Sequence, residues 1–276
     1  MMSVTASRQL SVADGPAFLR LMKHYVVDYT NSHDQAETAR IMEPDYALRM
    51  GPHNVVGRDT AYHAATRKQM DQFPGLGLTV HEVWTSGERL MMRFSEHGAS
   101  NRHDGALTAW GGIGLYRWNG DRLVSNSVEQ DYFSRARQMK TRAPNPVEGP
   151  AIAPWDTAAE APDATAEAIV RVWLEAGQLA RTPGVLCDDA WTGAEVGAIV
   201  DQSEILINDL FSCGAHVGFH ATQTGALLAD FALTQGDGGR QVELYMAGII
   251  HVVDGAVTSG RIIRNRLELQ RTLGAR

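Results

Sequence analysis

Hydrophobic residues recur with a helical period near the start of the chain and with a strand period further on. Six of them stand three or four positions apart, which predicts a helix that opens at Asp14 as its N-cap and ends within 31–34. The six are Phe18, Leu21, Met22, Tyr25, Val26 and Tyr29. A second helix is predicted over 58–72, because Phe-Pro-Gly follows it.

Beyond residue 76 the pattern alternates as in strands, and the second half of the chain repeats the order of elements. Strands are predicted at 78–85, 89–97, 107–118 and 123–133, with an Asn-Gly hairpin turn at 119–120. In the second half, helices are predicted near 163–180 and 201–211, with the segment 187–191 between them, and strands at 216–223, 226–235, 241–253 and 256–269. Helices followed by an antiparallel meander predict an α+β fold in each half.

The two halves also match residue by residue near their ends. Leu123 falls on Val257, Ser125 on Ser259, Val128 on Ile262, Phe133 on Leu267 and Arg137 on Arg271, while Asp131 falls on Asn265. His81 in Val-His-Glu-Val and His220 in Phe-His-Ala-Thr give a second match. We therefore expect two tandem domains, 1–140 and 163–276. The linker 141–162 holds half of the prolines, and we expect the first domain to be active and the second degenerate.

Composition narrows the class of protein. A net charge of −7 and a pI of about 5.8 give no reason to expect nucleic-acid or anionic-membrane binding. No stretch has the length and apolarity of a signal peptide or a membrane-spanning helix, so a cytoplasmic location is expected. The two cysteines, Cys187 and Cys213, are expected to be reduced thiols.

The predicted order of elements resembles that of the nuclear transport factor 2-like superfamily: a helix, a short strand, a helix and then long hairpins that end in Gly-Asp-Arg-Leu-Val. Ketosteroid isomerases, limonene-epoxide hydrolases, SnoaL-like polyketide cyclases and many non-catalytic binders belong to it. The resemblance implies a cystatin-like α+β barrel in each half, with a curved antiparallel cone packed on the N-terminal helices. It further implies an apolar pocket inside the cone. Sheet-against-sheet pairing is also implied, either within this chain or in a homo-oligomer.

The segment Gln130-Asp131-Tyr132-Phe133 resembles the Arg-Asp-Tyr-Phe stretch that carries the catalytic acid of the epoxide hydrolases. By alternation, Glu129 shares the face of Asp131. We expect Asp131 to be the catalytic acid/base inside the cone, where burial would raise its pKa. The structural alternative is a surface carboxylate beyond the sheet edge.

Arg93, Ser95 and His97 share one face of the preceding hairpin arm. The epoxide hydrolases have Arg-x-Asp here, so Ser95 removes the second carboxylate and disfavours that reaction. Arg93 would then orient Asp131 or stabilise an oxyanion, and His97 would act as a complementary acid or base. The counterparts in the second half were aligned as Asp230, Ala232 and Thr234.

The context of Tyr25 resembles the ketosteroid isomerase helix whose tyrosine stabilises an enolate. The isomerase base would fall near Arg49 or Met50, where no acid stands, so that arrangement is disfavoured. The expected substrate-binding residues are Tyr46, Tyr29, His63, Trp110, Tyr116 and Glu129, each with core packing as its alternative. The spacing indicates no metal site, and no glycine-rich turn indicates a nucleotide cofactor.

Two functions follow from these patterns. The first is a cofactor-independent lyase of the elimination or retro-aldol (deformylating) type, acting on a hydrophobic, aromatic, oxygenated small molecule. The cofactorless lyases of lignin-derived diarylpropanes are similar, and isomerase, epoxide hydrolase and polyketide cyclase are alternatives within the superfamily. The second is a tandem ligand-binding module without catalysis.

Overall fold

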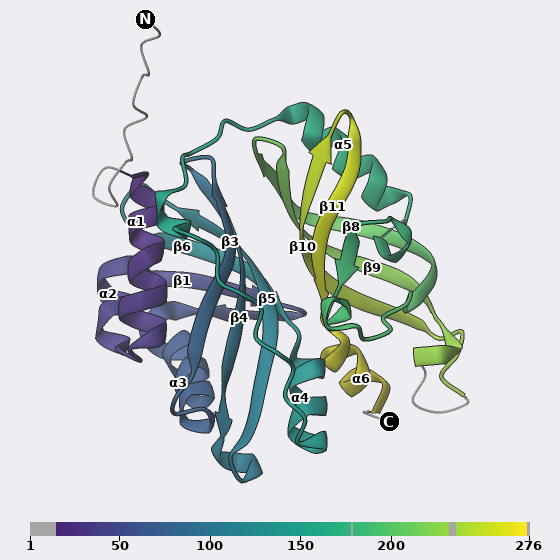
Figure 1. The fold of residues 1–276 in the computed structure, drawn as a ribbon, viewed down its shortest axis with the longest axis horizontal. Coiled ribbons are helices and arrows are strands. Elements are labelled where there is room, and N and C mark those ends of the chain that lie inside the picture. The colour runs from purple at the N-terminus through teal and green to yellow at the C-terminus, as the bar shows by residue number, and fades with distance from the viewer. Residues whose placement is uncertain (1–14, 178, 232–235, 275–276) are drawn as a thin grey trace, which may run out of the picture.

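The computed structural model describes residues 15–177, 179–231 and 236–274, so the expected N-cap Asp14 lies outside them. Figure 1 shows two curved sheets that stand back to back, with helices on their outer sides. The first sheet has the strand order β2-β1-β6-β5-β4-β3 and the second β7-β11-β10-β9-β8. The fold is therefore α+β, with two cone-like units in tandem.

The N-terminal unit begins with helices that cover the concave face of its sheet. Its elements are α1 (Ala17–Lys23), the π-helix η1 (His24–Asn31), the 3-10 turn η2 (Gln35–Glu37), α2 (Thr38–Ile41), β1 (Met42–Met50), β2 (His53–Val56), the π-helix η3 (Gly57–Tyr62), α3 (His63–Gln72), β3 (Gly77–Thr85), β4 (Arg89–Ser100), β5 (Ala106–Trp118), β6 (Leu123–Gln130) and α4 (Tyr132–Thr141). The expected helices and hairpins are present, although the last strand ends at Gln130 rather than at residue 133. The sheet is mixed rather than wholly antiparallel, because β1 pairs with β6 in parallel.

The C-terminal unit repeats this topology with fewer helices. Its elements are α5 (Ala164–Glu175), β7 (Val185–Cys187), β8 (Val200–Cys213), β9 (His216–Leu227), β10 (Gln241–Val253), β11 (Ala256–Arg264) and α6 (Arg266–Gly274). Here β7 pairs with β11 in parallel, as β1 does with β6.

Two predictions for this half were wrong. The predicted helix over 201–211 is strand β8: Ile205 and Ile207 face the core while Leu206 is exposed, a period of two that β-branched residues favour. The predicted strand over 226–235 is also wrong in its described part, because β9 ends at Leu227 and a 3-10 turn follows.

The repeat between the ends of the two halves is confirmed in detail. Gly114 pairs with Val128 on β5 and β6, and 134 positions later Gly248 pairs with Ile262 on β10 and β11. The same irregularity in register precedes both turns. Each second strand ends at an N-cap: the side chain of Asp131 accepts from Ser134 N, and that of Asn265 accepts from Glu268 N. Aspartate and asparagine cap helices equally well, which explains how they stand at one position.

The match of His81 with His220 is wrong by one strand. His81 lies on the edge strand β3, whose counterpart at the edge of the second sheet is β8. His220 lies on β9, the counterpart of β4. The alignment of Arg93 with Asp230 fails for the same reason, because Asp230 lies in the 3-10 turn after β9; Ala232 and Thr234 lie outside the described residues.

The convex faces of the two sheets pack against each other. Met91, Ile113 and Leu115 of the first sheet form one buried cluster with Phe211, Cys213, Ala247, Ile249 and Ile263 of the second. Arg89 and Arg117 pair with Asp209 across this contact, at 2.5 and 3.1 Å. Both faces of the N-terminal sheet are therefore buried, one inside the cone and the other against the second unit.

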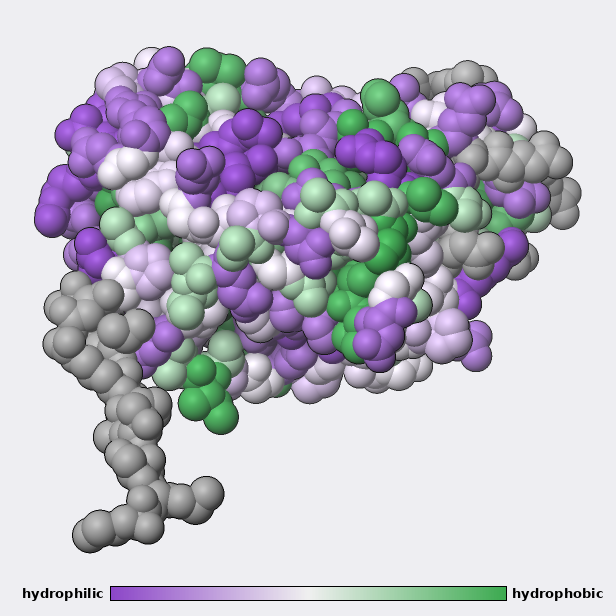
Figure 2. Space-filling view, turned by 90° about the horizontal axis from the view of Figure 1, so that it is seen from above, coloured by the Kyte–Doolittle hydropathy of each residue, from purple (hydrophilic) through white to green (hydrophobic). Residues whose placement is uncertain are grey.

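The outer surface carries no large apolar face in the view of Figure 2, where hydrophobic and hydrophilic residues are interspersed. Among the described residues, no helix is long and apolar enough to cross a membrane. Cys187 and Cys213 are both buried and free.

Candidate functional site

The N-terminal cone encloses a cavity of about 440 Å³ between the concave face of its sheet and the helices η1, η3 and α3. This volume is in the range of small-molecule sites. Apolar side chains form much of the wall: Leu48, Met50, Val55, Met70 and Leu76. The polar groups of the wall are three tyrosines of the helices, Thr30, Thr66, Gln69, Glu96, Gln130 and Tyr132, with charged residues at the edge. A mostly apolar cavity with few polar groups is typical of a ligand site.

Glu96 on β4 is the carboxyl group inside this cavity. Gln69 on α3 donates a hydrogen bond from Nε2 to Glu96 Oε2 at 2.6 Å, and Tyr132 donates from its hydroxyl to Gln69 Oε1 at 3.1 Å. On the other side, Trp110 Nε1 donates to Gln130 Oε1 at 2.7 Å. These contacts fix the carboxyl group and the two amides in one network across α3, β4, β5 and β6.

Burial raises the pKa of Glu96 from its ordinary 4.5 to about 7. The Arg135 guanidinium and hydrogen bonds from Gln69, Gln130 and Trp110 act in the opposite direction but do not outweigh burial. Arg135 stacks on the ring of Tyr132, with its guanidinium carbon 3.9 Å from the ring centroid. A carboxyl group with a pKa near neutrality exchanges its proton readily at cellular pH, which is what general acid/base catalysis requires.

The tyrosines of the helices provide neutral hydrogen-bond donors to the same cavity. Tyr25, Tyr29 and Tyr62 line it, and burial raises the pKa of each phenol, so all three stay protonated. The Tyr29 hydroxyl is buried and has no hydrogen-bond partner among the described residues. An unpaired buried hydroxyl costs about 1–3 kcal/mol, which a ligand oxygen that accepted its proton would recover.

The second unit contributes to the edge of the cavity. Arg271 on α6 lines it together with His53 and Lys68 of the first unit. His53 and Arg271 both contact Glu268, at 3.6 and 3.4 Å. Figure 1 shows α6 beside α4, next to the lower part of the first sheet, which is how a residue of the second unit reaches the first cone.

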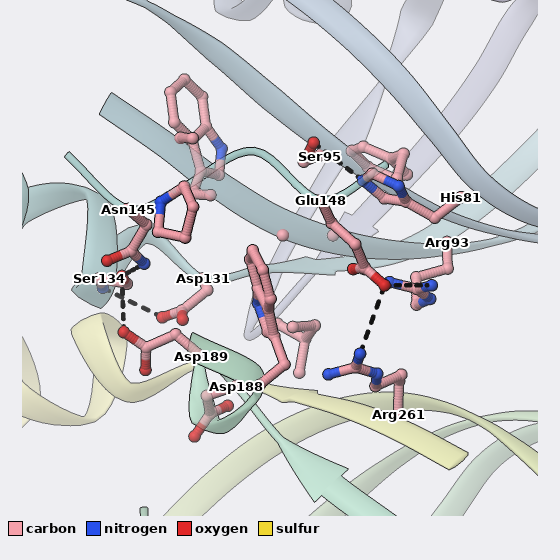
Figure 3. Close-up of a pocket in the computed structure, with 18 residues that line it drawn as sticks. His81, Arg93, Ser95, Asp131, Ser134, Asn145, Glu148, Asp188, Asp189 and Arg261 are labelled. Atoms are coloured by element: carbon pink, nitrogen blue, oxygen red, sulfur yellow. Dashed lines mark hydrogen bonds and ion pairs between the residues drawn. The ribbon is translucent and has the colours of Figure 1, made fainter. Parts of the chain in front are cut away.

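Asp131 lies outside the cone, so the expectation that it faces the cavity is wrong. Both of its oxygens accept from Arg266 Nη2 at 2.8 Å, and Arg266 also bonds Asp189. Burial, together with the carboxylates of Asp188 and Asp189, raises the pKa of Asp131 to about 6 in spite of Arg266. Figure 3 shows Asp131 close to Ser134 and Asp189, between the two units. The cavity there encloses about 30 Å³, which suits a water molecule but no aromatic substrate.

Arg93, His97 and Glu129 also lie on the convex face rather than in the cone. Arg93 donates to Glu82 at 2.8 Å and to Glu148 of the linker at 2.6 Å, as Figure 3 shows for Glu148. His97 Nε2 lies 3.3 Å from Thr79 Oγ1. Glu129 is fully buried between the units and bonds His220 and Asn265. Arg93 thus joins the linker to the first sheet, and Glu129 joins the second unit to it, while His97 contacts the neighbouring strand β3.

Four of the expected substrate-binding residues are packing residues near the cavity. Tyr46 meets Tyr62 edge-on at 5.1 Å between ring centroids, and Tyr116 meets Tyr25 at 5.8 Å; neither lines the cavity. His63 lies 2.8 Å from Thr38 Oγ1, outside the cavity. Trp110 does not line the cavity either, and its ring nitrogen donates a hydrogen bond to Gln130, which does.

Comparison with protein-family models finds the SnoaL-like domain, matched by residues 23–126. The matched segment runs from the end of α1 into β6 and contains Glu96 and the helices that cover it. The second sheet repeats the topology of the SnoaL-like domain, so the chain holds two nuclear transport factor 2-like units in tandem.

Several solved structures are similar to this SnoaL-like domain. One is a proposed SnoaL-like polyketide cyclase from Jannaschia sp. CCS1, with 12% identity and a TM-score of 0.41, covering 50% of this chain and 97% of that chain. A second is IdmH from Streptomyces antibioticus, a proposed polyketide cyclase, with 15% identity, a TM-score of 0.39 and coverages of 44% and 96%. A third is AclR from Streptomyces galilaeus, a proposed hydroxylase, with 14% identity, a TM-score of 0.41 and coverages of 46% and 87%. A comparison with curated proteins finds no match.

Sequence reasoning missed Glu96, Gln69 and Gln130, which line the cavity. The available signal was alternation: Glu96 is the acidic residue on the face of β4 that also carries Met92 and Phe94, both buried in the cone. A carboxylate in line with core residues is a stronger sign of a functional site than one at a strand end.

Proposed function

We propose that the N-terminal cone catalyses a cofactor-independent lyase reaction of the retro-aldol or elimination type on a hydrophobic, oxygenated small molecule. The observation that carries the proposal is Glu96, a buried carboxyl group with a pKa near 7 in a largely apolar cavity that also presents tyrosine hydroxyls. A binding module has no need of such a group, because a buried carboxyl that is partly ionised at neutral pH costs free energy.

In a retro-aldol step the Glu96 carboxylate takes the proton of the substrate's β-hydroxyl group. The bond between the α and β carbons breaks, and its electron pair moves into the enolate of the neighbouring carbonyl. The Tyr29 hydroxyl donates to the enolate oxygen, where negative charge develops. Glu96 then returns the proton to the α carbon, so the group ends in the state in which it began. The aldehyde fragment leaves.

The same groups serve an aldol ring closure when the sequence runs backwards, so a polyketide-type cyclisation is the alternative within this chemistry. Both directions need a carboxyl group whose pKa lies near the working pH, because it must accept and return one proton in each turnover. The apolar part of the wall, formed by Leu48, Met50, Val55, Met70 and Leu76, favours substrates with large hydrophobic surfaces, including aromatic substrates.

The test is a turnover screen of the purified chain, with Glu96→Gln and Asp131→Asn beside the wild type. The panel holds aryl-propanediols, β-hydroxy ketones, epoxides, enones and linear polyketide mimics. We expect turnover by the wild type and by Asp131→Asn, and loss in Glu96→Gln. Turnover lost in Asp131→Asn and kept in Glu96→Gln would move the catalytic group to the interface and sink the proposal. Tight ligand binding by all three proteins without turnover would make the cone a binding module.

A further inference from the structure

A histidine and two carboxylates meet on the outer side of the helical layer, away from the cavity. His24 and Asp28 lie one turn apart at the start of η1, and Glu37 lies in η2 after the turn that follows. His24 Nδ1 lies 2.6 Å from Asp28 Oδ2 and 4.0 Å from Glu37 Oε1. One atom from each side chain falls within 4.8 Å of the other two; among the described residues this is the group with three such side chains.

Glu37 separates this cluster from an ordinary surface ion pair. Its side chain is only 9% exposed, and Oε1, the oxygen nearer to His24, has no hydrogen-bond partner among the described residues. The other oxygen accepts from Arg40 at 3.1 Å. A buried carboxylate oxygen without a donor is costly, and a cation bound between Glu37, His24 and Asp28 would satisfy it.

We propose that His24, Asp28 and Glu37 bind a divalent transition-metal ion, with zinc the best fit to the ligand set. One imidazole nitrogen and two carboxylate oxygens are typical protein ligands of zinc, and a water molecule completes a tetrahedron. Ligand atoms on a tetrahedral zinc ion lie about 3.4 Å apart, between the 2.6 and 4.0 Å seen here. The side chains of His24 and Asp28 are half-exposed, which leaves them free to rotate toward that spacing when an ion binds.

Metal binding here would brace the helix that carries Tyr25 and Tyr29. The ligands on η1 and the ligand on η2 belong to two segments joined by a short turn, so one ion would fix the angle between them. π-helical segments such as η1 are common at functional sites, because their wider turn is tolerated only where it positions a group. The site is independent of Glu96 and of the proposed reaction.

The experiment uses the full chain, freed of metal with EDTA and titrated with zinc chloride in a calorimeter at neutral pH. We expect one zinc ion per chain and a higher Tm, since the ion binds the folded state. Loss of a residue that only hydrogen-bonds a metal ligand lowers metal affinity roughly 10- to 100-fold. His24→Ala and Glu37→Gln each remove a ligand itself, so each should lower zinc affinity by more than that. His53→Ala is the matched control: His53 is an exposed histidine 3.6 Å from Glu268, and its zinc binding should equal that of the wild type.

Cobalt provides a second measurement that needs no variant. Cobalt bound by one nitrogen and three oxygens in a tetrahedron gives visible absorption bands that hydrated cobalt lacks. These bands should appear at one equivalent, without the near-ultraviolet band of a thiolate ligand. The proposal is overturned by a wild type that takes up neither metal, by zinc affinity that is equal in wild type, His24→Ala and Glu37→Gln, or by a thiolate band that assigns the metal to Cys187 or Cys213.

Discussion

In the N-terminal cone Glu96 pairs with Trp110 across β4 and β5, and at the same register in the C-terminal cone Gln223 pairs with Leu244 across β9 and β10. The correspondence follows from the hairpins, which match at an offset of 134 residues. The position of the buried carboxyl group thus holds an amide in the second cone. The same offset puts Arg264 at the position of Gln130 and Arg266 at that of Tyr132.

The cavities of the two cones also differ in volume and in the residues that line them. The second encloses about 280 Å³, and Gln223 and Arg264 line it together with Glu175 and Asp201. Arg264 is held by Asp188 through bonds of 2.7 to 2.9 Å, so its charge is already neutralised. A neutral amide cannot transfer a proton, so the position of Glu96 holds no acid/base group in the second cone.

Side chains at the start of α6 in the second unit contact the first unit. Arg266, at the start of α6, bonds Asp131 and Asp189, and Arg271, one turn later, reaches the edge of the first cavity. A repeated fold can therefore keep its backbone register while the side chains at equivalent positions differ, here a buried carboxyl group in one cone and residues that contact the neighbouring unit in the other. The following experiments test that division of roles.

The largest effect is expected from Glu96→Gln, which gives the first cone the residue of the second. The kcat/KM should fall about 10²- to 10⁴-fold, since proton transfer by a positioned group contributes that much. Gln223→Ala should leave kcat/KM unchanged, because Gln223 lines the second cavity and not the one that holds Glu96. A loss of activity in Gln223→Ala equal to that in Glu96→Gln would refute the division between the cones.

The pH dependence of the wild type sharpens this prediction. Because the Glu96 carboxylate is the base, kcat/KM should rise with pH and level off above a pKa of about 7. The folded-state pKa exceeds the ordinary 4.5, so the folded chain binds more protons than the unfolded chain between these values. The free energy of unfolding should therefore decrease as pH rises through that window, and Glu96→Gln should abolish this part of the decrease. Urea unfolding at a series of pH values measures it.

Breaking the contact between the units should affect stability rather than chemistry. Arg266→Leu removes a positive charge that pairs with the buried carboxylates of Asp131, Asp188 and Asp189. This variant should lower the free energy of unfolding by about 3–5 kcal/mol. Asp131→Asn should cost far less, because asparagine caps α4 as Asn265 caps α6 and one of three crowded carboxylates is removed.

The wild-type contribution of Asp131 can be read from pH in the same experiment. Its folded-state pKa is raised to about 6 from 3.8, so the ionised form is the disfavoured one in the folded chain. The stability of Asp131→Asn relative to wild type should therefore increase as pH rises through this window. The opposite trend would mean that the charged pair with Arg266 dominates.

A smaller effect is expected from Tyr29→Phe, which removes the unpaired hydroxyl and keeps the ring. The kcat should fall roughly 10²-fold, at the lower end of the effect of losing one oxyanion donor. Tyr46→Phe is the control, because its hydroxyl also has no partner among the described residues but lies outside the cavity lining. Equal losses in the two variants would mean that packing, and not hydrogen bonding to substrate, explains the effect.

The smallest effect is expected from Arg271→Ala, which tests whether the second unit assists binding. This side chain is 64% exposed, so its charge is screened and KM should rise only about two- to five-fold. The kcat should not change, and Arg102→Ala, at an exposed position away from the cavity, should change neither constant. A large fall in kcat would instead put Arg271 in contact with the reacting atoms.

The sequence by itself determined the repeat, the hairpins and the residues that share each strand face. Turn residues and alternation are local properties, so Asn119-Gly120 and the register around Val128 and Ile262 could be predicted from neighbours in the chain. Alternation correctly grouped Glu129 with Asp131 and separated both from Gln130 and Tyr132.

Only the tertiary structure decided which face points into the cone. Hydrophobicity identifies a buried face only where the other face is solvated, and here Ile113 and Leu115 pack between the sheets while Tyr116 packs in the cone. With both faces buried, the choice between Asp131 and Glu96 depended on contacts far apart in sequence, such as Arg266 with Asp131 and Gln69 with Glu96. The prediction of a helix over 201–211 was wrong for a related reason: which of these residues are buried depends on the pairing of β8 with β9, a contact that the local sequence does not contain.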